Sequence, residues 1–153
     1  MCTLHGLPVG WALTGAKADE RVVLSQILAA TPALATMVEN RQPGRRQIMI
    51  ADKNYYGREF EADLDASGIE LLRPARRGEP PRPGQQFFKP LRQVIESINA
   101  TLKGQLDLER HGGKTIAGVC ARIAQRILAL TAAIWHNDQL GANIRRSLTA
   151  YDH

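Results

Sequence analysis

The eleven residues 47–57, QIMIADKNYYG, decide how this chain can fold. Gln47 to Ala51 form a short, mostly apolar run between turn residues, which predicts a buried strand. Asp52 follows the run directly, so its carboxylate is expected at the carboxyl end of that strand. Asp52 also begins an Asp-Lys-Asn sequence, which is typical of a turn because Asp and Asn side chains bond to nearby backbone N–H groups.

The residues that come next predict a helix and a second strand. Gly57 to Ala66 place Phe60 and Leu64 on one helical face, and Gly68 is suited to end a helix. The apolar run Ile69–Leu72 then predicts another strand. A strand, a helix and a strand in this order indicate an α/β fold.

The residues before this segment predict one more strand and two helices. Val9 to Leu13 favour a strand, with glycine and proline on either side. Asp19 is suited to cap a helix that runs up to Pro32, because apolar residues recur there at helical spacing. A second short helix is predicted through Met37, and a basic turn follows at residues 41–46.

Two long helices are predicted in the second half of the chain. Apolar residues recur at helical spacing from Phe87 to about Leu106, and Pro90 is compatible with this helix if it lies in the first turn. The same periodicity runs from about Thr115 to Trp135. The pattern predicts one folded domain over residues 1–136, and a frayed helix or a C-terminal tail over residues 137–153.

Composition is consistent with a basic protein of the cell interior. The 153 residues are 44% hydrophobic, enough for one compact domain with a core. Twenty Lys and Arg against 15 Asp and Glu give a net charge of +5, which favours a polyanionic partner such as nucleic acid. Cys2 and Cys120 are far apart, so no disulfide framework or zinc site is indicated, and the reducing cytoplasm is expected.

Membrane and secreted proteins are excluded by the same reading of the sequence. The longest apolar stretches, such as Ile127–Trp135, are too short to span a bilayer. The N-terminus lacks the charged start and the apolar run of a signal peptide.

A proline-rich basic segment carries the excess positive charge. Residues 71–95 contain six Lys or Arg against one acid, Glu79, and this local +5 equals the net charge of the chain. Four prolines between 73 and 84 predict an extended loop. We expect the loop to bind DNA phosphates, with a solvated loop as the alternative. Its basic residues are Arg73, Arg76, Arg77 and Arg82.

A polar stripe is predicted beside the apolar face of the helix that begins at Phe87. At 100° per residue the stripe includes Glu96 flanked by basic residues. One interpretation is a solvated face with an Arg92–Glu96 ion pair at i, i+4 spacing, worth about 0.2–0.5 kcal/mol. The other is that Glu96 and the strand-end Asp52 converge on divalent metal ions. The members of the stripe are Lys89, Arg92, Glu96, Asn99 and Lys103.

On these residues the chain resembles the DDE transposases of bacterial insertion sequences, which have a ribonuclease-H-like catalytic core. Residues 50–57, IADKNYYG, are similar to the family's strand-end segment with the second catalytic Asp. Arg92, Glu96 and Lys103 match the Arg-x3-Glu-x6-Lys spacing around the catalytic Glu. The family usually has a Tyr three residues before the Arg, where this chain has Lys89.

The N-terminal part is also similar to the family. His5-Gly6-Leu7-Pro8 followed by Asp19-Glu20 resembles the stretch after the first catalytic strand, so the likeness covers the chain up to about Trp135. The strand with the first catalytic Asp would precede residues 4–13. The resemblance therefore implies a ribonuclease-H-like mixed sheet flanked by helices, in a truncated form that lacks its first strand.

The resemblance implies metal-dependent phosphodiester cleavage and strand transfer at transposon ends. Asp52 and Glu96 would be catalytic residues and ligands of a two-ion Mg²⁺ or Mn²⁺ site, complete only in the full enzyme. Lys89, Arg92 and Lys103 would contact double-stranded DNA. The place of action would be the bacterial cytoplasm, at the nucleoid when DNA is bound, and whether the chain forms a homo-oligomer is left open.

Activity of the chain by itself is a separate question. It is an enzyme by resemblance, but with two of three carboxylates we expect it alone to be inactive. Two alternatives are a ribonuclease-H-like nuclease and a non-catalytic DNA-binding or subunit-interaction remnant of a transposase. Tyr55 and Tyr56 either pack beside the strand or stack on an unpaired base.

Overall fold

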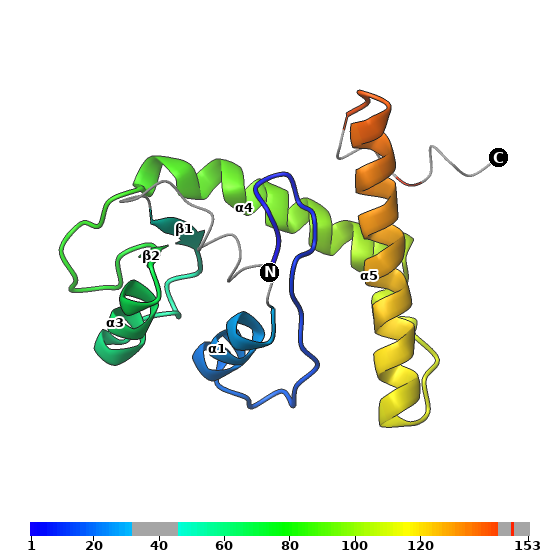
Figure 1. Cartoon of the computed structure of the whole chain (residues 1–153), viewed down its shortest axis with the longest axis horizontal. Helices are drawn as coiled ribbons and strands as arrows, with labels where there is room; N and C mark the ends of the chain where they lie inside the picture. Colours follow the sequence, from blue (N-terminus) through cyan, green and yellow to red (C-terminus); the bar gives the residue numbers. More distant parts are fainter. Residues whose placement is uncertain (32–45, 144–147, 149–153) are drawn as a thin grey trace. The chain divides into compact units, whose positions relative to one another are not determined.

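The fold is given by a computed structural model that describes residues 1–31, 46–143 and 148 (Figure 1). The chain divides into two compact units. One contains Thr14–Lys89, and the other contains Met1–Leu13 together with Pro90–His153. The predicted helix through Met37 and most of the predicted basic turn at 41–46 lie outside the described residues.

The Thr14–Lys89 unit is built on a strand–helix–strand crossover. β1 (Gln47–Ile50) and β2 (Ile69–Leu72) are parallel and pair Gln47 with Ile69 through Ile50 with Leu72. α3 (Arg58–Ala66) connects them and packs beside the pair in Figure 1. Parallel strands need such a crossover, because a tight turn reverses the chain direction. The predicted helix and both predicted strands of this segment are confirmed, and they are compatible with an α/β fold.

The core of this unit lies between α3 and the two strands. Leu64, Ile69 and Leu71 form a buried cluster, and partly buried apolar residues pack against it. β2 is buried at three of its four positions, whereas Gln47 and Ile48 at the start of β1 are exposed. The prediction that β1 is a buried strand was therefore only half right, because the described sheet has two strands and covers little of β1. The partly buried residues against the cluster are Leu28, Met49, Ala51, Tyr55 and Phe60.

α1 (Glu20–Ala30) begins where the sequence predicted. The Asp19 carboxylate accepts a hydrogen bond from the Arg21 N–H, so Asp19 is the N-cap of the helix. Leu24 is the buried residue of α1, and Leu28 reaches the core cluster. The helix ends at Ala30, just before the predicted limit at Pro32.

The predicted strand Val9–Leu13 is wrong. These residues form no strand, and the local pairing is an isolated antiparallel bridge between Cys2 and Pro8. Trp11 and Leu13 are exposed, and among the described residues the strands β1 and β2 pair only with each other. Gly6 instead brings the N-terminal turn against α4, since a Cβ at Gly6 would lie 3.2 Å from Ile98 Cδ1.

α4 (Gln85–Ala100) continues without a break into a π-helical turn at Thr101–Gln105. Together they span the predicted helix from Phe87 to Leu106, with a start two residues earlier. Pro90 is the sixth residue of α4, beyond the first turn where the sequence argument placed it. Its missing N–H interrupts the helical hydrogen bonds at the boundary between the two units.

α5 (Ile116–Gln139) is the longest helix and follows a short 3₁₀ turn at Leu108–Arg110. The Thr115 side chain caps α5 by accepting from the Gly118 N–H. The helix includes Asn137, which is 1% exposed, so the first residues of the predicted 137–153 tail belong to α5.

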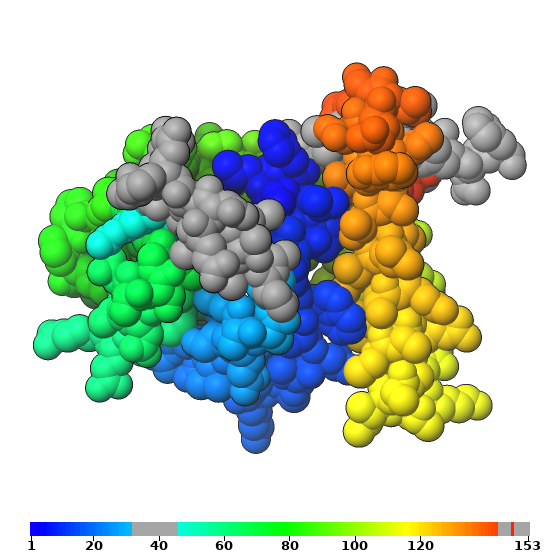
Figure 2. Space-filling model, in the orientation of Figure 1, coloured from blue at the N-terminus to red at the C-terminus, as the bar shows by residue number. Residues whose placement is uncertain are grey.

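α5 is also long and apolar enough to cross a membrane, judged by length and composition alone, with a mean hydropathy of 1.4 over its best 18 residues. Only 6% of that window is buried, and side chains project outward along α5 in Figure 2, in yellow to orange. The argument that no stretch is long enough is therefore wrong. One such helix is weak evidence for a membrane protein, because core helices of soluble proteins pass the same test.

Gly113 is a position where the fold needs glycine. A Cβ on Gly113 would lie 2.6 Å from the Val119 backbone nitrogen, which is fixed in the first turn of α5. We expect Gly113→Ala to lower the free energy of unfolding by about 1–3 kcal/mol, because backbone has to move. Gly104→Ala is the control, since nothing lies within 4 Å of its Cβ. Urea unfolding followed by circular dichroism measures both, and equal stability of the two variants would contradict the packing.

Candidate active site

Asp52 stands at the carboxyl end of β1, as predicted. The parallel pairing continues one residue past the strand, because the Ala51 N–H donates to the Leu72 carbonyl at 3.0 Å. The Asp52 Oδ1 accepts from the Asn54 N–H at 3.0 Å, and its carbonyl accepts from the Tyr55 N–H at 3.1 Å. The expected Asp-Lys-Asn turn is thus present. It fixes one carboxylate oxygen and leaves the exposed Oδ2 with no protein donor among the residues that the structure describes.

Glu96 lies on the exposed side of α4 and forms the predicted i, i+4 pair. Arg92 Nε donates to Glu96 Oε1 at 2.8 Å, with the two side chains 81% and 60% exposed. Lys103, in the π-helical turn, is paired with Glu109 at 2.7 Å. Lys89 is exposed in α4. The basic residues around Glu96 are therefore on the surface, with carboxylates near two of them.

Asp52 and Glu96 belong to different units of the chain. Their expected convergence on one pair of metal ions therefore stays a prediction. Within the described residues, no group of three or more His, Cys, Asp or Glu side chains could hold a metal ion.

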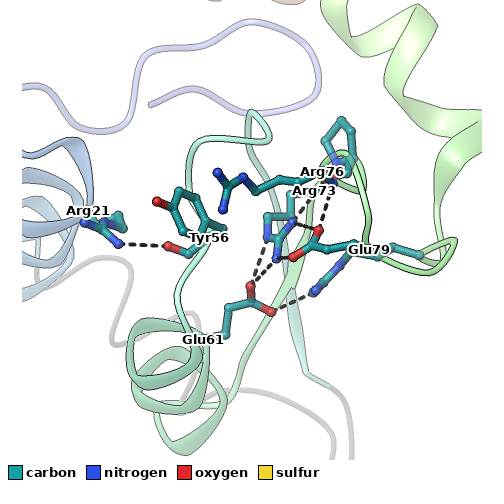
Figure 3. A network of polar contacts seen from close by, with 8 residues as sticks. Arg21, Tyr56, Glu61, Arg73, Arg76 and Glu79 are labelled. Atoms are coloured by element: carbon teal, nitrogen blue, oxygen red, sulfur yellow. Dashed lines mark hydrogen bonds and ion pairs between the residues drawn. The ribbon is translucent and has the colours of Figure 1, made fainter.

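The basic loop contains a charge cluster that the sequence did not reveal. Arg73 is 2% exposed, and its guanidinium bonds Glu61 from α3 and Glu79 from the loop, both at 2.8 Å (Figure 3). Arg82 binds the other oxygen of Glu61 at 2.7 Å. Glu61 lies 12 and 21 positions before Arg73 and Arg82 in the sequence, so no local pattern could have identified it as their partner.

The cluster alters the expected distribution of positive charge. Two of the four loop arginines, Arg73 and Arg82, are neutralised by carboxylates, and Arg73 is too buried to meet DNA. The assignment of Arg73 to a DNA-binding surface is therefore corrected to a structural role. Arg76 and Arg77 are exposed, and neither has a carboxylate partner among the described residues.

The carboxylates of the cluster are strongly stabilised as anions. The hydrogen bonds from Arg73, together with that of the Arg76 backbone N–H, hold the pKa of Glu79 at about 2. Burial raises the pKa of Glu61, but the hydrogen bonds from Arg82 and Arg73 outweigh it, and the net pKa is lowered. Both carboxylates therefore favour the ionised form, and Glu79 keeps it down to a pH of about 2.

The two tyrosines after Asp52 have different surroundings. Tyr55 packs against the core cluster, 6.4 Å from the Phe60 ring, and burial raises its pKa. Tyr56 is exposed, and the Arg76 guanidinium lies 3.5 Å from its ring centroid. Arg21 is 5.4 Å from the same centroid. The ring lies between the two guanidinium groups in Figure 3, so stacking of a base on Tyr56 is not available in this arrangement.

Residues 1–132 match a protein family described as the transposase DDE domain. The chain belongs to this family. No curated protein and no solved structure matches the chain. Membership in the transposase DDE domain family supports a transposase-type function with a DNA substrate, and this family generally uses divalent metal ions.

The donor chemistry of the candidate residues fits such ions. Asp52 and Glu96 are exposed carboxylates, and hard oxygen ligands of this kind suit Mg²⁺ and Mn²⁺. Each has an oxygen with no hydrogen bond from the described residues.

The charge cluster predicts a specific acid sensitivity of folding. A carboxylate with a lowered folded-state pKa contributes full stability above its unfolded value and loses it as the pH falls through the folded value. For Glu79 this window runs from 4.5 down to about 2. We expect Glu79→Gln to be less stable than wild type at pH 7 and to lose less stability across that window.

Chemical unfolding at several pH values measures this effect. Glu70→Gln is the matched control, because Glu70 lies exposed on β2 and forms no ion pair among the described residues. It should keep the wild-type pH dependence. If Glu79→Gln retained that dependence as well, the cluster would not be the source of acid sensitivity.

Proposed function

We propose that this chain acts in DNA transposition as part of a DDE transposase, by metal-dependent phosphodiester cleavage and strand transfer at transposon ends. The supporting observation is the family match over residues 1–132 together with an exposed Asp52 at the carboxyl end of a parallel strand. Strand ends of α/β sheets are rigid places for ligands and catalytic groups. An insertion sequence of a bacterium is the proposed origin.

Asp52 and Glu96 are the proposed metal ligands and catalytic residues. The turn at Asn54 holds Asp52 with one oxygen outward, and Glu96 projects from α4 at a point where it is open to solvent. In such a site, bound Mg²⁺ or Mn²⁺ supplies activation of the attacking water or 3′-hydroxyl and stabilisation of the leaving oxygen. For this to occur the two carboxyl groups must lie within about 8 Å of each other.

The basic residues near Glu96 are proposed to bind the DNA backbone. Exposed ion pairs contribute only about 0–1 kcal/mol, so the Arg92–Glu96 and Lys103–Glu109 pairs are easily exchanged. Binding of Glu96 to a metal ion would end its exposed ion pair with Arg92. Lys89 adds a further exposed charge on α4.

The partial ligand set favours a second candidate function, that of a non-catalytic DNA-binding or subunit-interaction part of a transposase. The observation behind it is that the described residues contain no group of three metal-ligating side chains. Experiment can distinguish the two functions. Both predict salt-dependent DNA binding. Only the first predicts metal-dependent cleavage and strand transfer once a third carboxylate is supplied.

Metal binding tests the proposed site without requiring turnover. We expect Asp52→Asn and Glu96→Gln each to weaken Mn²⁺ binding about tenfold, because each removes a charged oxygen ligand. Asp63→Asn, on the exposed side of α3, is the control and should bind as wild type. Calorimetric titration of the full chain gives the affinities. Equal binding by all three variants would contradict the site.

Cleavage of transposon-end duplexes tests the reaction. We expect little or no cleavage by the 153-residue chain with Mg²⁺ or Mn²⁺, since two carboxylates hold the second ion poorly. A chain that includes a further strand with its Asp should cleave and transfer a 3′ end, and Glu96→Gln should abolish both. Robust cleavage by the short chain would show that another residue supplies the third ligand, and cleavage without strand transfer would indicate a nuclease.

A further inference from the structure

We propose that Arg76, held on the ring of Tyr56, is a phosphate-binding position for the DNA backbone beside Asp52, and that Tyr56 is its positioning residue. The proposal rests on the proposed function, because it takes nucleic acid to be the ligand. It adds a specific site and gives Tyr56 the role of positioning Arg76, instead of stacking on a base.

The guanidinium of Arg76 is fixed from two directions. Its Cζ lies 3.5 Å from the Tyr56 ring centroid, which is stacking distance (Figure 3). Its backbone N–H donates to Glu79 Oε2 at 2.8 Å, and its carbonyl accepts from the Glu79 N–H at 3.0 Å. Glu79 in turn forms an ion pair with the buried Arg73. Backbone and side chain of Arg76 are therefore both held before any ligand binds.

Its charge is nevertheless uncompensated. Within the described residues Arg76 makes no ion pair, and no hydrogen bond from its guanidinium is found. A guanidinium that stacks by its face keeps its N–H groups free at the edge, in the planar fork that suits two phosphate oxygens. Pre-ordering reduces the conformational entropy lost on binding.

Arg21 also lies near the Tyr56 ring, but its role differs from that of Arg76. Its charge is paired with Asp19 in two hydrogen bonds, and Nη1 donates to the Tyr56 carbonyl at 3.0 Å. Arg21 therefore anchors Tyr56 to α1, and Arg76 is the cation left for an external anion. The contrast with Arg77 is equally clear, because Arg77 is exposed in the same loop and has no aromatic partner among the described residues.

The position suits a substrate strand. Tyr56 is four residues after Asp52 in the same loop, so their Cα atoms are at most about 14 Å apart. Arg76 is stacked on a residue of the same short segment as Asp52, so one DNA strand could pass both positions. The stack would then fix the register of the strand at the candidate active site.

A DNA-binding titration of the full chain tests the proposal with a fluorescent duplex at several salt concentrations. Arg76→Ala should weaken binding about tenfold and lower the slope of log affinity against log salt by about 0.9. Arg77→Ala removes one positive charge from the adjacent residue and should lower the DNA-binding affinity threefold or less. Tyr56→Leu should weaken binding threefold to tenfold, whereas Tyr56→Phe, which keeps the ring, should match wild type.

Non-additivity separates positioning from an independent contact. If Tyr56 acts only through Arg76, the double variant Arg76→Ala/Tyr56→Leu binds no worse than Arg76→Ala alone. Additive losses, equal effects of Arg76→Ala and Arg77→Ala, or an Arg76→Ala loss that changes with the duplex sequence would each overturn the proposal. Circular dichroism confirms that each variant folds, and the comparison of Arg76→Ala with Arg77→Ala carries the test if Tyr56→Leu does not fold.

The same titration distinguishes this proposal from the proposed function. Salt-dependent binding by wild type with no special effect at Arg76 leaves the transposase function standing and removes the phosphate position. Absence of any salt-dependent binding by wild type overturns both.

Discussion

A guanidinium group that is 2% exposed requires carboxylate partners, because an unpaired charge in the interior costs several kcal/mol. Arg73 follows β2 directly and finds Glu61 on α3 and Glu79 in the loop. This one side chain therefore joins the end of the parallel pair, the crossover helix and the proline-rich segment. These bonds adjoin the edge of the sheet where Asp52 stands, since Ala51 pairs with Leu72 next to Arg73.

The same constraint decides which charges are left for a ligand. Glu79 is held by Arg73 and in turn holds the Arg76 backbone, so the buried cluster sets the position of an exposed guanidinium. The basic residues that the sequence distributes over the whole loop thus have two different surroundings in the fold. One part is internal and neutral, and the other part faces outward beside the loop that carries Asp52.

Local patterns in the sequence were sufficient for the crossover. The alternation of apolar runs with Gly57 and Gly68 predicted β1, α3 and β2 to within a residue, and Asp19 was correctly read as a helix cap. Val9–Leu13 failed because a strand depends on a partner, which sequence periodicity does not supply. The roles of Glu61 and Tyr56 could not be foreseen, since they depend on contacts with residues 12 to 21 positions away.

The central proposal is that Asp52 and Glu96 are ligands of one metal site. Anomalous X-ray scattering from crystals of the chain soaked with Mn²⁺ tests it most directly. The account predicts a manganese peak between the two side chains, with their carboxyl groups within about 8 Å of each other. Manganese bound elsewhere, or carboxyl groups much farther apart in the crystal, would contradict the account.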